Sequence, residues 1–283
     1  MTAPARDLLA RGRTFRLGGR PWLMAIVNTS PDSFSGDGED PARADIVDVG
    51  GESARTDRPA VAPEEEIARV VAPIEALVAD GALVSVDTYK PAVAEAAIAA
   101  GAAIVNDTSG LRDPELADVC AAGGAALVLM HTVGTPKEKV LDHDYGDVAA
   151  DVAAFLRERI ELATARGVAF ESLILDPGPD FGKSPAQTVA ALHALPALHE
   201  LERPLLAAVS RKDFVGALTG RVPRERLAGT LAAVAYGVEA GAHILRVHDV
   251  AAAADYLAVR EALQGDAKVA QGLRLDEALR REE

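Results

Sequence analysis

Polar side chains that close short apolar runs are the residues of this sequence best placed to do chemistry. Asp87, for example, directly follows the apolar run at 83–86. An aspartate at a strand end is more often the N-cap of the next helix than a catalytic group. Capping alone, however, does not explain eight runs that nearly all end in chargeable or amide side chains. The candidates are Asn28, Glu52, Arg55, Asp87, Asn106, Asp107, Met130, His131, Asp176, Arg211, Lys212, Arg246 and His248.

These candidates divide by charge along the chain. Asp87, Asn106 and Asp176 supply acceptors for N–H donors such as those of an aminopyrimidine or a pterin ring. The last two runs are followed by the cations Lys212 and Arg246, and such groups suit phosphate oxygens. The division predicts a substrate with a donor-rich head and a phosphate or pyrophosphate tail. The alternative for Lys212 is an ion pair with a neighbouring aspartate.

Two glycine-rich loops, 33–38 and 50–60, follow the first two runs and favour mobile lids over a site. Their alternative is a pair of ordinary solvated loops. Asp32 and Asp37 could help to hold Mg²⁺, which prefers carboxylate and phosphate oxygens. His248 either belongs to the phosphate end or is a buried neutral imidazole.

The elements that must position these residues alternate regularly. Short apolar runs are typical of strands buried on both faces of a parallel sheet, and Ala-rich stretches with helical spacing separate most of them. Eight such units predict a single (β/α)₈ TIM barrel with its chemistry at the C-terminal strand ends. A doubly wound open sheet is the alternative. The runs are 23–27, 46–49, 83–86, 103–105, 126–130, 173–175, 205–209 and 244–247, and the helical stretches are 63–79, 91–100, 114–122, 147–166, 185–201, 225–240 and 250–263.

Three segments depart from the repeating unit. The link at 29–44 contains prolines and glycines but no helical stripe, so the first outer helix is expected to be missing or reduced to a turn. Residues 13–23, with two adjacent glycines, predict a small hairpin that could plug the bottom of the barrel. The domain prediction is a barrel with this hairpin over 1–265, followed by a charged tail over 266–283 that is a surface helix or frayed.

Composition narrows the class of protein. The 283 residues include 29 Lys plus Arg and 43 Asp plus Glu, a formal net charge of −14, so nucleic acid and membranes are not expected partners. Hydrophobic residues make up 49% of the chain, enough for a full core. The lone Cys120 excludes an internal disulfide. Without a signal-peptide pattern or a long apolar run, a cytoplasmic location is expected.

Nine segments carry a resemblance to the dihydropteroate synthase family, the pterin-binding barrels of folate synthesis. The resemblance implies a TIM barrel that condenses 6-hydroxymethyl-7,8-dihydropterin pyrophosphate with p-aminobenzoate to give 7,8-dihydropteroate and pyrophosphate. It also implies Mg²⁺ and a homodimer. The segments are NTSPDSF (28–34), DVGGESAR (48–55), SVDTYK (85–90), VNDTSG (105–110), LVLMHTVGTP (127–136), LDPGPDFGK (175–183), SRKDF (210–214), LAGTLAAVAYGVEAGAHI (227–244) and RVHDV (246–250).

The resemblance assigns roles to individual residues. Those that match the pterin-ring site are Asp87, Asn106, Asp176 and Lys212, and the two aspartates and the lysine are also expected to act in catalysis. Other matches to substrate-binding residues are Arg246 and His248 at the pyrophosphate, Phe34 and Arg55 in loops over p-aminobenzoate, and Met130 and Phe181. Asn28 matches the Mg²⁺ ligand. The family chemistry looks dissociative, with pyrophosphate leaving before a pterin cation is trapped.

Some positions near the expected site depart from the family pattern. The second loop has Ala54 where a hydroxyl is usual, followed by Thr56 and Asp57 in place of Pro-Gly. Asp213 follows Ser-Arg-Lys, where it would repel a benzoate carboxylate or simply cap a helix. Asp180 lies beside Pro179 in a segment that usually reads DPGIGFGK. The shortened link at 29–44 is a further departure.

These departures leave alternatives open. Asp180 and Asp213 look like a divergent second paralogue of some bacteria, which would use another acceptor or lack synthase activity. A methyltetrahydrofolate–corrinoid methyltransferase has a similar barrel, but Lys212, Arg246 and His248 together count against it. A non-enzymatic pterin-binding protein would keep the pterin carboxylates while the first two loops degenerate.

Overall fold

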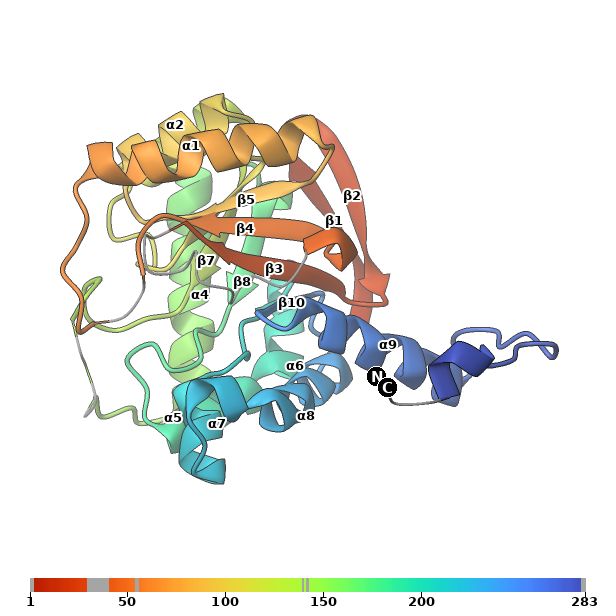
Figure 1. The fold of residues 1–283 in the computed structure, drawn as a ribbon. Helices are drawn as coiled ribbons and strands as arrows, with labels where there is room; N and C mark the ends of the chain where they lie inside the picture. Colours follow the sequence, from red (N-terminus) through yellow and green to blue (C-terminus); the bar gives the residue numbers. More distant parts are fainter. Residues whose placement is uncertain (1–2, 30–40, 54–55, 139, 141–142, 281–283) are drawn as a thin grey trace.

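Eight parallel strands form one sheet that curves into a barrel (Figure 1). The computed structural model describes residues 3–29, 41–53, 56–138, 140 and 143–280. The barrel strands are β3 (Trp22–Asn28), β4 (Ile46–Gly50), β5 (Val84–Asp87), β6 (Ile104–Asp107), β7 (Ala126–Met130), β8 (Leu173–Asp176), β9 (Leu206–Ala207) and β10 (Ile244–Val247).

The order of the strands is β8-β7-β6-β5-β4-β3-β10-β9. A parallel bridge between Leu175 and Leu205 brings the two ends of this order together, so the sheet is nearly closed. The TIM barrel predicted from the sequence is therefore confirmed, and the open sheet is wrong. β9 is shorter than the predicted strand at 205–209, because its ladder to β10 contains only two residue pairs.

Helices cover the outside of the barrel, and local sequence explains where several begin. α1 starts with Pro63, whose missing N–H is no loss in a first turn, and Asp147 caps α4 by accepting from Ala149 and Ala150. Ser184 and Gln187 form a capping box on α5. The helices are α1 (Pro63–Ala79), α2 (Pro91–Ala99), α3 (Glu115–Gly123), α4 (Val148–Ala165), α5 (Pro185–His193), α6 (Leu195–Leu198), α7 (Asp213–Thr219), α8 (Leu227–Glu239) and α9 (Val250–Gln264).

The helices differ from the predicted set in two places. The stretch predicted at 185–201 is divided into α5, α6 and a 3₁₀ turn at His199–Leu201. Pro196 lies in the first turn of α6 and has no N–H to continue the α5 ladder. α7 is not among the predicted helical stretches, because its seven residues are too few to show a helical period; only the capping alternative for Asp213 pointed to a helix there.

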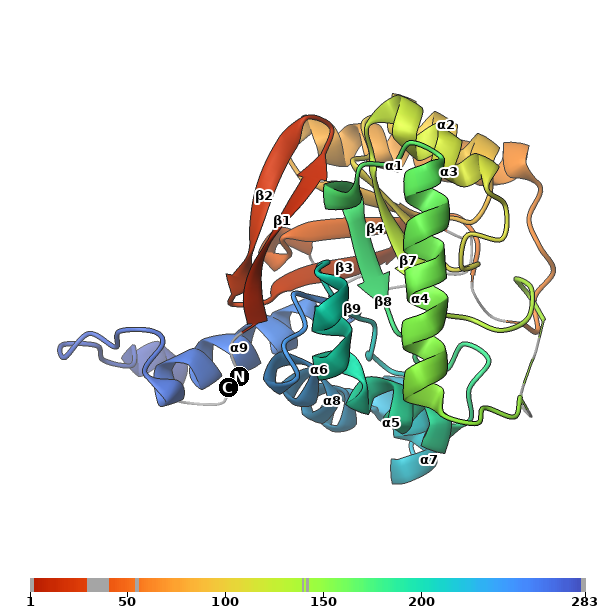
Figure 2. The ribbon, with the colours of Figure 1, turned by 180° about the vertical axis from the view of Figure 1, so that it is seen from behind.

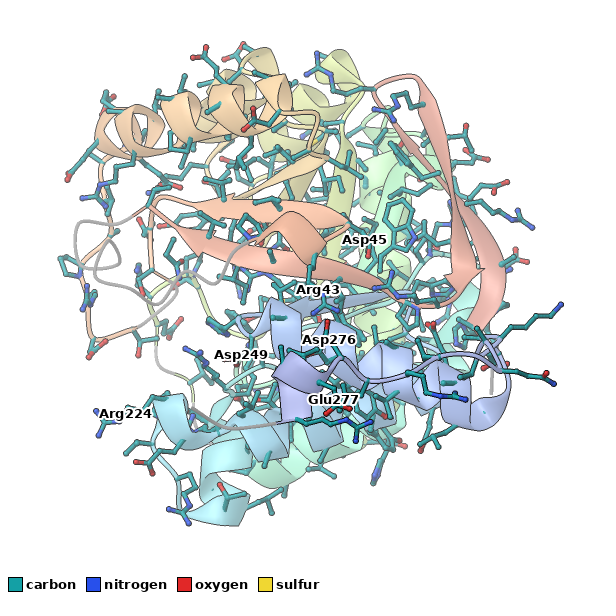
Figure 3. All side chains as sticks on the ribbon, turned by 45° about the vertical axis from the view of Figure 1, so that its right-hand side comes forward. Arg43, Asp45, Arg224, Asp249, Asp276 and Glu277 are labelled. Carbon is teal, nitrogen blue, oxygen red and sulfur yellow. The ribbon has the colours of Figure 1, made fainter. Side chains whose placement is uncertain are left out.

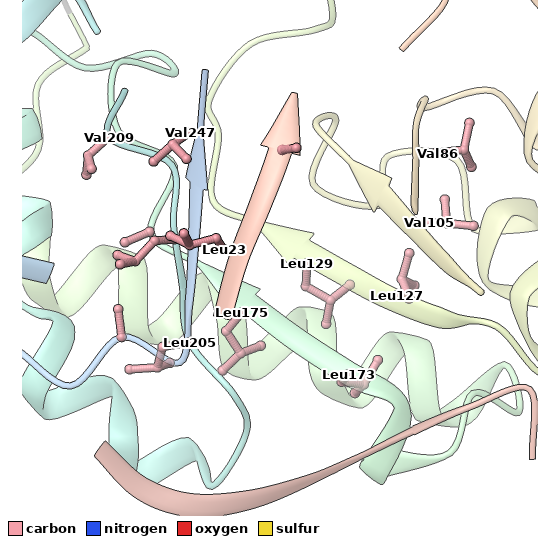
Figure 4. Close-up of a cluster of buried hydrophobic side chains, with 14 of the residues drawn as sticks. Leu23, Val86, Val105, Leu127, Leu129, Leu173, Leu175, Leu205, Val209 and Val247 are labelled. Carbon is pink, nitrogen blue, oxygen red and sulfur yellow. The ribbon is translucent and has the colours of Figure 1, made fainter. Parts of the chain in front are cut away.

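Each strand separates two hydrophobic layers because its side chains alternate in direction. Residues such as Leu23, Val86 and Leu127 pack outward against the helices, as the cluster in Figure 4 shows. The other set, which includes Met24 and Ile104, fills the barrel interior. The lower interior is therefore closely packed with aliphatic side chains, and the polar candidates lie above it.

A hairpin of β1 (Ala3–Ala10) and β2 (Arg13–Gly19) covers the N-terminal end of the barrel (Figure 2). Its buried Leu8 and Leu17 pack into the interior cluster at the beginnings of the strands. The turn lies at Arg11 and Gly12, both with positive φ, where a tight hairpin needs them. The predicted position at 13–23 was wrong, because the paired glycines 18–19 end β2 and do not form the turn.

The prediction for the link at 29–44 falls mostly outside the described residues. Its described end contains one 3₁₀ turn, Pro41–Arg43, which lies against α9. Arg43, labelled in Figure 3, has its Nη1 2.7 Å from Asp255 Oδ1. Beyond α9, the exposed chain extends away from the barrel in Figures 1 and 2 and contains a 3₁₀ turn at Glu277–Arg280. The boundary at 265 remains a prediction. Within the described ranges, no helix combines the length and apolar character that a membrane crossing requires.

His243 fastens the hairpin to the barrel. Its Nε2 lies 2.8 Å from the carbonyl oxygen of Pro4, and its Nδ1 accepts the N–H of Leu205 at 3.0 Å. The ring is 1% exposed, and burial lowers its pKa to about 4. A neutral imidazole with the proton on Nε2 satisfies both contacts.

We expect His243→Ala to lower the free energy of unfolding by about 1–3 kcal/mol, because two buried backbone groups lose their partner. Since the pKa is depressed in the fold, His243 also makes wild-type stability fall as the pH drops from about 6.5 to about 4. Urea titrations at several pH values would measure both effects, with the exposed His193→Ala as control. A His243→Ala curve that overlays the control would contradict the anchoring role.

Candidate active site

Four residues form one row across neighbouring strands at the C-terminal end of the barrel. Asn28 of β3 is in register with Gly50 of β4, Gly50 with Asp87 of β5, and Asp87 with Asn106 of β6. An amide, a carboxylate and a second amide therefore lie at one level. Gly50 leaves open the space between its neighbours, since a Cβ there would lie 3.5 Å from Asp87 Cβ and 3.7 Å from Asn28 Oδ1.

An ion cluster connects this row to β10. Arg246 Nε donates to Asp48 Oδ2 at 2.7 Å, and Arg246 Nη2 donates to Asp87 Oδ2 at 2.6 Å. Asn106 Nδ2 donates to the same Asp48 oxygen at 2.9 Å. Asp48 is wholly buried on β4. Asp48 was not among the candidates predicted from the sequence, because it lies inside an apolar run and not at its end.

A second group lies on β8 and after β9. Asp176 is in register with Met130 of β7, and its Oδ1 accepts the N–H of Gly178 at 2.7 Å. Lys212 Nζ lies 4.5 Å from the centre of the Phe181 ring, a cation–π distance. The charge of Lys212 acts on Asp176 and on Asp87, so the two groups share one electrostatic environment.

Burial shifts the titration of these groups in opposite directions. It raises the pKa of Asp87 to about 7, against the lowering effect of Arg246, and it raises the pKa of Asp176. Burial also lowers the pKa of Lys212, although Asp180 and Asp176 favour its charged form. The mouth of the barrel thus holds acids and a base whose proton affinities have been brought closer together.

His248 completes the β10 side of the site. Its backbone N–H donates to Ser210 Oγ at 3.1 Å, and its Nδ1 lies 3.1 Å from the same oxygen. Burial, together with the charge of Arg246, lowers the pKa of His248 to about 4, so the ring is neutral at pH 7. Neighbouring Arg211 is paired with Asp249, with contacts of 2.5 and 3.1 Å.

The loop that follows Asp176 is held by a buried lysine that the sequence analysis did not select. Lys183 Nζ donates to the carbonyl oxygens of Gly178 at 2.8 Å and Phe181 at 3.1 Å, and lies 2.8 Å from His131 Nδ1. Burial lowers the pKa of Lys183 to about 7 and that of His131 to about 3. These contacts fix the position of Phe181 and therefore of Lys212 above it.

The second loop is held at its base by Glu52. Its carboxylate accepts from Lys90 Nζ at 2.7 Å and from the Val61 N–H at 2.7 Å, and lies 3.2 Å from Lys137 Nζ. Burial alone would raise the pKa of Glu52, but the bond from Lys90 leads the contacts that lower it. Of the loop residues predicted to matter, Phe34, Arg55, Asp32, Asp37 and Ala54 lie outside the described residues.

The two unusual aspartates lie on either side of the start of α7. Asp180, with a positive φ, accepts the N–H of Asp213 on Oδ2 at 2.5 Å and bonds Thr188 Oγ1 through Oδ1 at 3.0 Å. The Asp213 side chain is 89% exposed and lies 3.0 Å from Arg226 Nη1. Lys212, and not Asp213, is the N-cap residue of α7, so the predicted capping role for Asp213 was one residue off.

The chain is similar to known proteins over most of its length. A family model described as "Pterin binding enzyme" matches residues 24–248. The chain is 38% identical to the dihydropteroate synthase of Escherichia coli (strain K12) over 90% of this chain and 95% of that protein. It is 41% identical to a probable bifunctional folylpolyglutamate synthase/dihydropteroate synthase of Haloferax volcanii, over 81% of this chain but only 30% of that longer protein.

The fold also matches the Xanthomonas albilineans dihydropteroate synthase solved with 4-aminobenzoic acid. The TM-score is 0.84 with 44% identity, covering 92% of this chain and 99% of that one. The same synthase solved with 7,8-dihydropteroate gives a TM-score of 0.79. The chain belongs to the pterin-binding enzyme family. Within that family it is a dihydropteroate synthase, a transferase that releases pyrophosphate.

For this pterin-binding enzyme, the site residues divide into those that the structure brings together and those it does not describe. Asp87, Asn106, Asp176, Lys212 and Arg246 converge on one mouth through the contacts given above. Phe34 and Arg55 are not described. Their substrate contacts, and those of the other predicted residues, remain proposals.

Lys183→Met should loosen the loop of the pterin-binding site, because the carbonyl oxygens of Gly178 and Phe181 and the Nδ1 of His131 lose their partner. We expect about 2–4 kcal/mol of lost stability. The pKa of Lys183 is about 7 in the fold and 10.5 in the unfolded chain, so its burial penalty disappears as the pH rises from 7 to 10.5. The stability gap between wild type and Lys183→Met should therefore widen over that range in urea titrations. A gap independent of pH, like that of the exposed Lys268→Met control, would contradict this account.

Proposed function

We propose that this chain condenses 6-hydroxymethyl-7,8-dihydropterin pyrophosphate with p-aminobenzoate at the C-terminal mouth of its barrel. One observation carries the proposal: Asp87, Asn106 and Asp176 form a set of acceptors next to the cations Lys212 and Arg246. Such a mouth suits a ring with several N–H donors joined to a pyrophosphate. The related Xanthomonas albilineans structures with 4-aminobenzoic acid and 7,8-dihydropteroate support the same substrates.

The acceptors would bind and orient the pterin ring. Asn106 and Asp176 are almost wholly buried, so hydrogen bonds to them form in a medium that weakly screens charge. As the pyrophosphate leaves, positive charge develops on the pterin, and Asp87 and Asp176 lie where their carboxylates stabilise it. Lys212 lies over the Phe181 ring and interacts electrostatically with these carboxylates. From this position its ammonium group would contact the substrate between the pterin ring and the pyrophosphate.

The cationic end would stabilise the leaving group. Arg246 of β10 and neutral His248, directly after that strand, lie at the same mouth, and an arginine fork binds phosphate oxygens well. The described residues contain no group of three or more His, Cys, Asp or Glu that could hold a metal. Asn28 is exposed at the end of β3, and its amide oxygen would suit a Mg²⁺ ion held mainly by pyrophosphate and water. Such an ion would neutralise charge on the leaving pyrophosphate.

A second candidate uses a different acceptor at the same pterin site. The observation in its favour is Asp180, whose carboxylate lies at the start of α7 directly after Lys212. A benzoate carboxylate placed there would meet this negative charge. Asp213 is a weaker argument for repulsion, because its side chain points into solvent and pairs with Arg226.

Assembly and location are further proposals. We infer a homodimer, supported by the exposed apolar side chains of Leu218, Val222 and Leu227 on and between α7 and α8. Light scattering of the purified chain would measure its mass directly. We also infer action in the cytoplasm, consistent with a single buried thiol at Cys120.

Pyrophosphate release is the direct test of the reaction. Purified protein with the pterin pyrophosphate and Mg²⁺ should release pyrophosphate only when p-aminobenzoate is present, and Lys212→Ala should lower the rate at least about 100-fold. Binding of the pterin pyrophosphate without release that depends on p-aminobenzoate would favour the second candidate. Absence of both release and binding would contradict each of them.

The raised pKa of Asp87 predicts the pH dependence. If the ionised carboxylate holds the ring, kcat/KM for the pterin pyrophosphate should fall below a midpoint of about 7, as Asp87 takes up a proton. The pKa of His248, about 4, places its own titration below this limb. A His248→Gln enzyme should therefore show the same fall in kcat/KM with a midpoint of about 7. A midpoint below pH 5 in the wild-type enzyme would contradict the assignment to Asp87.

A further inference from the structure

Asp48 is the one residue of the ion cluster to which neither the strand-end pattern nor the resemblance assigned a role. It lies one level below the row of Asn28, Gly50, Asp87 and Asn106, in register with Ser85 of β5. Ser85 is in register with Ile104, and Ile104 with Ala126, so this level is apolar on the next two strands. A buried carboxylate there is costly and adds nothing to packing.

We propose that Asp48 is a positioning residue of the pterin site, which fixes the groups that Asn106 and Arg246 present to the substrate. The inference rests on the proposed function and deepens it. Asp48 itself does not touch the substrate in this proposal; it acts through the two residues to which it is bonded.

The first consequence concerns the amide of Asn106. An amide can present either its NH₂ or its oxygen to a ligand, and only its partners decide which. A carboxylate oxygen accepts but cannot donate, so the contact of 2.9 Å requires Nδ2 to face Asp48. The amide oxygen is thereby left free as an acceptor. With the carboxylates of Asp87 and Asp176, Asn106 then offers a third acceptor to the N–H groups of a pterin.

The second consequence concerns the guanidinium of Arg246. Asp48 takes Nε and Asp87 takes Nη2, at 2.7 and 2.6 Å. The remaining N–H groups, those of Nη1 above all, stay available to an anion. Two anchors on β4 and β5 hold the long side chain across the barrel, so little rotamer freedom is left to lose when pyrophosphate binds.

The partners of Asp48 are also unequally distributed between its oxygens. Oδ2 accepts both bonds, whereas Oδ1 is buried and has no hydrogen-bond partner among the described residues. A carboxylate kept in place only to stabilise the fold would be expected to use both oxygens. Concentration of both bonds on Oδ2 places Asn106 and Arg246 at the same atom, which couples their positions.

Asp48→Asn is the test, because it keeps the shape but removes the charge and lets either end of the new amide face Asn106. Ser85→Ala is the matched control: Ser85 is equally buried in the same register, and its Oγ has no hydrogen-bond partner in the part of the chain that is described. Calorimetry would measure the Kd of the pterin pyrophosphate and, separately, of 6-hydroxymethylpterin and of inorganic pyrophosphate. Thermal melting would record stability, and steady-state assays would give KM for both substrates.

We expect Asp48→Asn to raise the Kd of the pterin pyrophosphate about 10- to 100-fold, the size expected for a lost charged hydrogen bond. The Kd values of 6-hydroxymethylpterin and of inorganic pyrophosphate should rise as well, because Asn106 binds the first and Arg246 the second in this proposal. KM for p-aminobenzoate should change less than about twofold, and Ser85→Ala should leave all Kd values near wild type. A lower melting temperature with unchanged Kd would show a purely structural role and overturn the proposal.

A double-mutant cycle keeps the proposal testable if Asp48→Asn alone folds poorly. Asp48→Asn/Arg246→Gln replaces the ion pair by a neutral pair of similar size, which removes the uncompensated charge. If Asp48 acts through Arg246, the double variant should bind pyrophosphate no more than about twofold more weakly than Arg246→Gln. If the fold-changes in Kd of the two single variants multiply in the double variant, the two residues act independently and the proposal is overturned. Wild-type protein that fails to bind the pterin pyrophosphate would instead refute the proposed function, and the positioning role with it.

Discussion

A guanidinium held between two carboxylates inside the barrel is the interaction on which the site depends. Arg246 reaches from β10 to Asp48 on β4 and Asp87 on β5, across the intervening β3. Burial makes each isolated charge unfavourable, so each member of the cluster is tolerable only because the others are present. The same contacts fix the relative positions of three strands at the end where substrate chemistry takes place.

The two ends of the barrel consequently contain different kinds of side chain. At the N-terminal end, aliphatic side chains and the hairpin fill the interior, and His243, Arg6 and Arg11 make polar contacts between hairpin and barrel. At the C-terminal end, carboxylates, amides and cations replace them, supported from outside by Lys183 and Glu52. The lower half buries the apolar side chains that stabilise the fold, and the upper half carries the candidate site, a division common to enzymes on this fold.

The sequence was a good guide where a signal was local. Asp87, Asn106 and Asp176 could be found because they end apolar runs, and parallel strands bring such ends together. Asp48 could not be found this way, because it lies inside a run and only its partners on distant strands explain it. Lys183 was missed for the same reason, since its partners are loop carbonyls and a histidine about fifty residues earlier.

The same difference between local and non-local signals explains which features of the fold were predicted correctly. The run lengths predicted eight strands, but the hairpin turn was misplaced because paired glycines resemble a turn as much as Arg11 and Gly12 do. α7 escaped detection because seven residues are too few for a helical period. The opposing roles considered for Asp213 could be weighed only once its exposed position beside Arg226 was known.

The bond between His243 and Pro4 has a consequence for biosynthesis. It joins residues 239 positions apart, so the beginning of the chain must wait until synthesis has reached β10, the last strand. The hairpin itself is local and can form early, but on the ribosome it has no finished barrel to close. Until β10 is made, the aliphatic interior is open along one edge, and Asp48 and Asp87 still lack their arginine. A nascent chain in this condition exposes both apolar surface and unpaired strand edges, which makes it a natural client for chaperones.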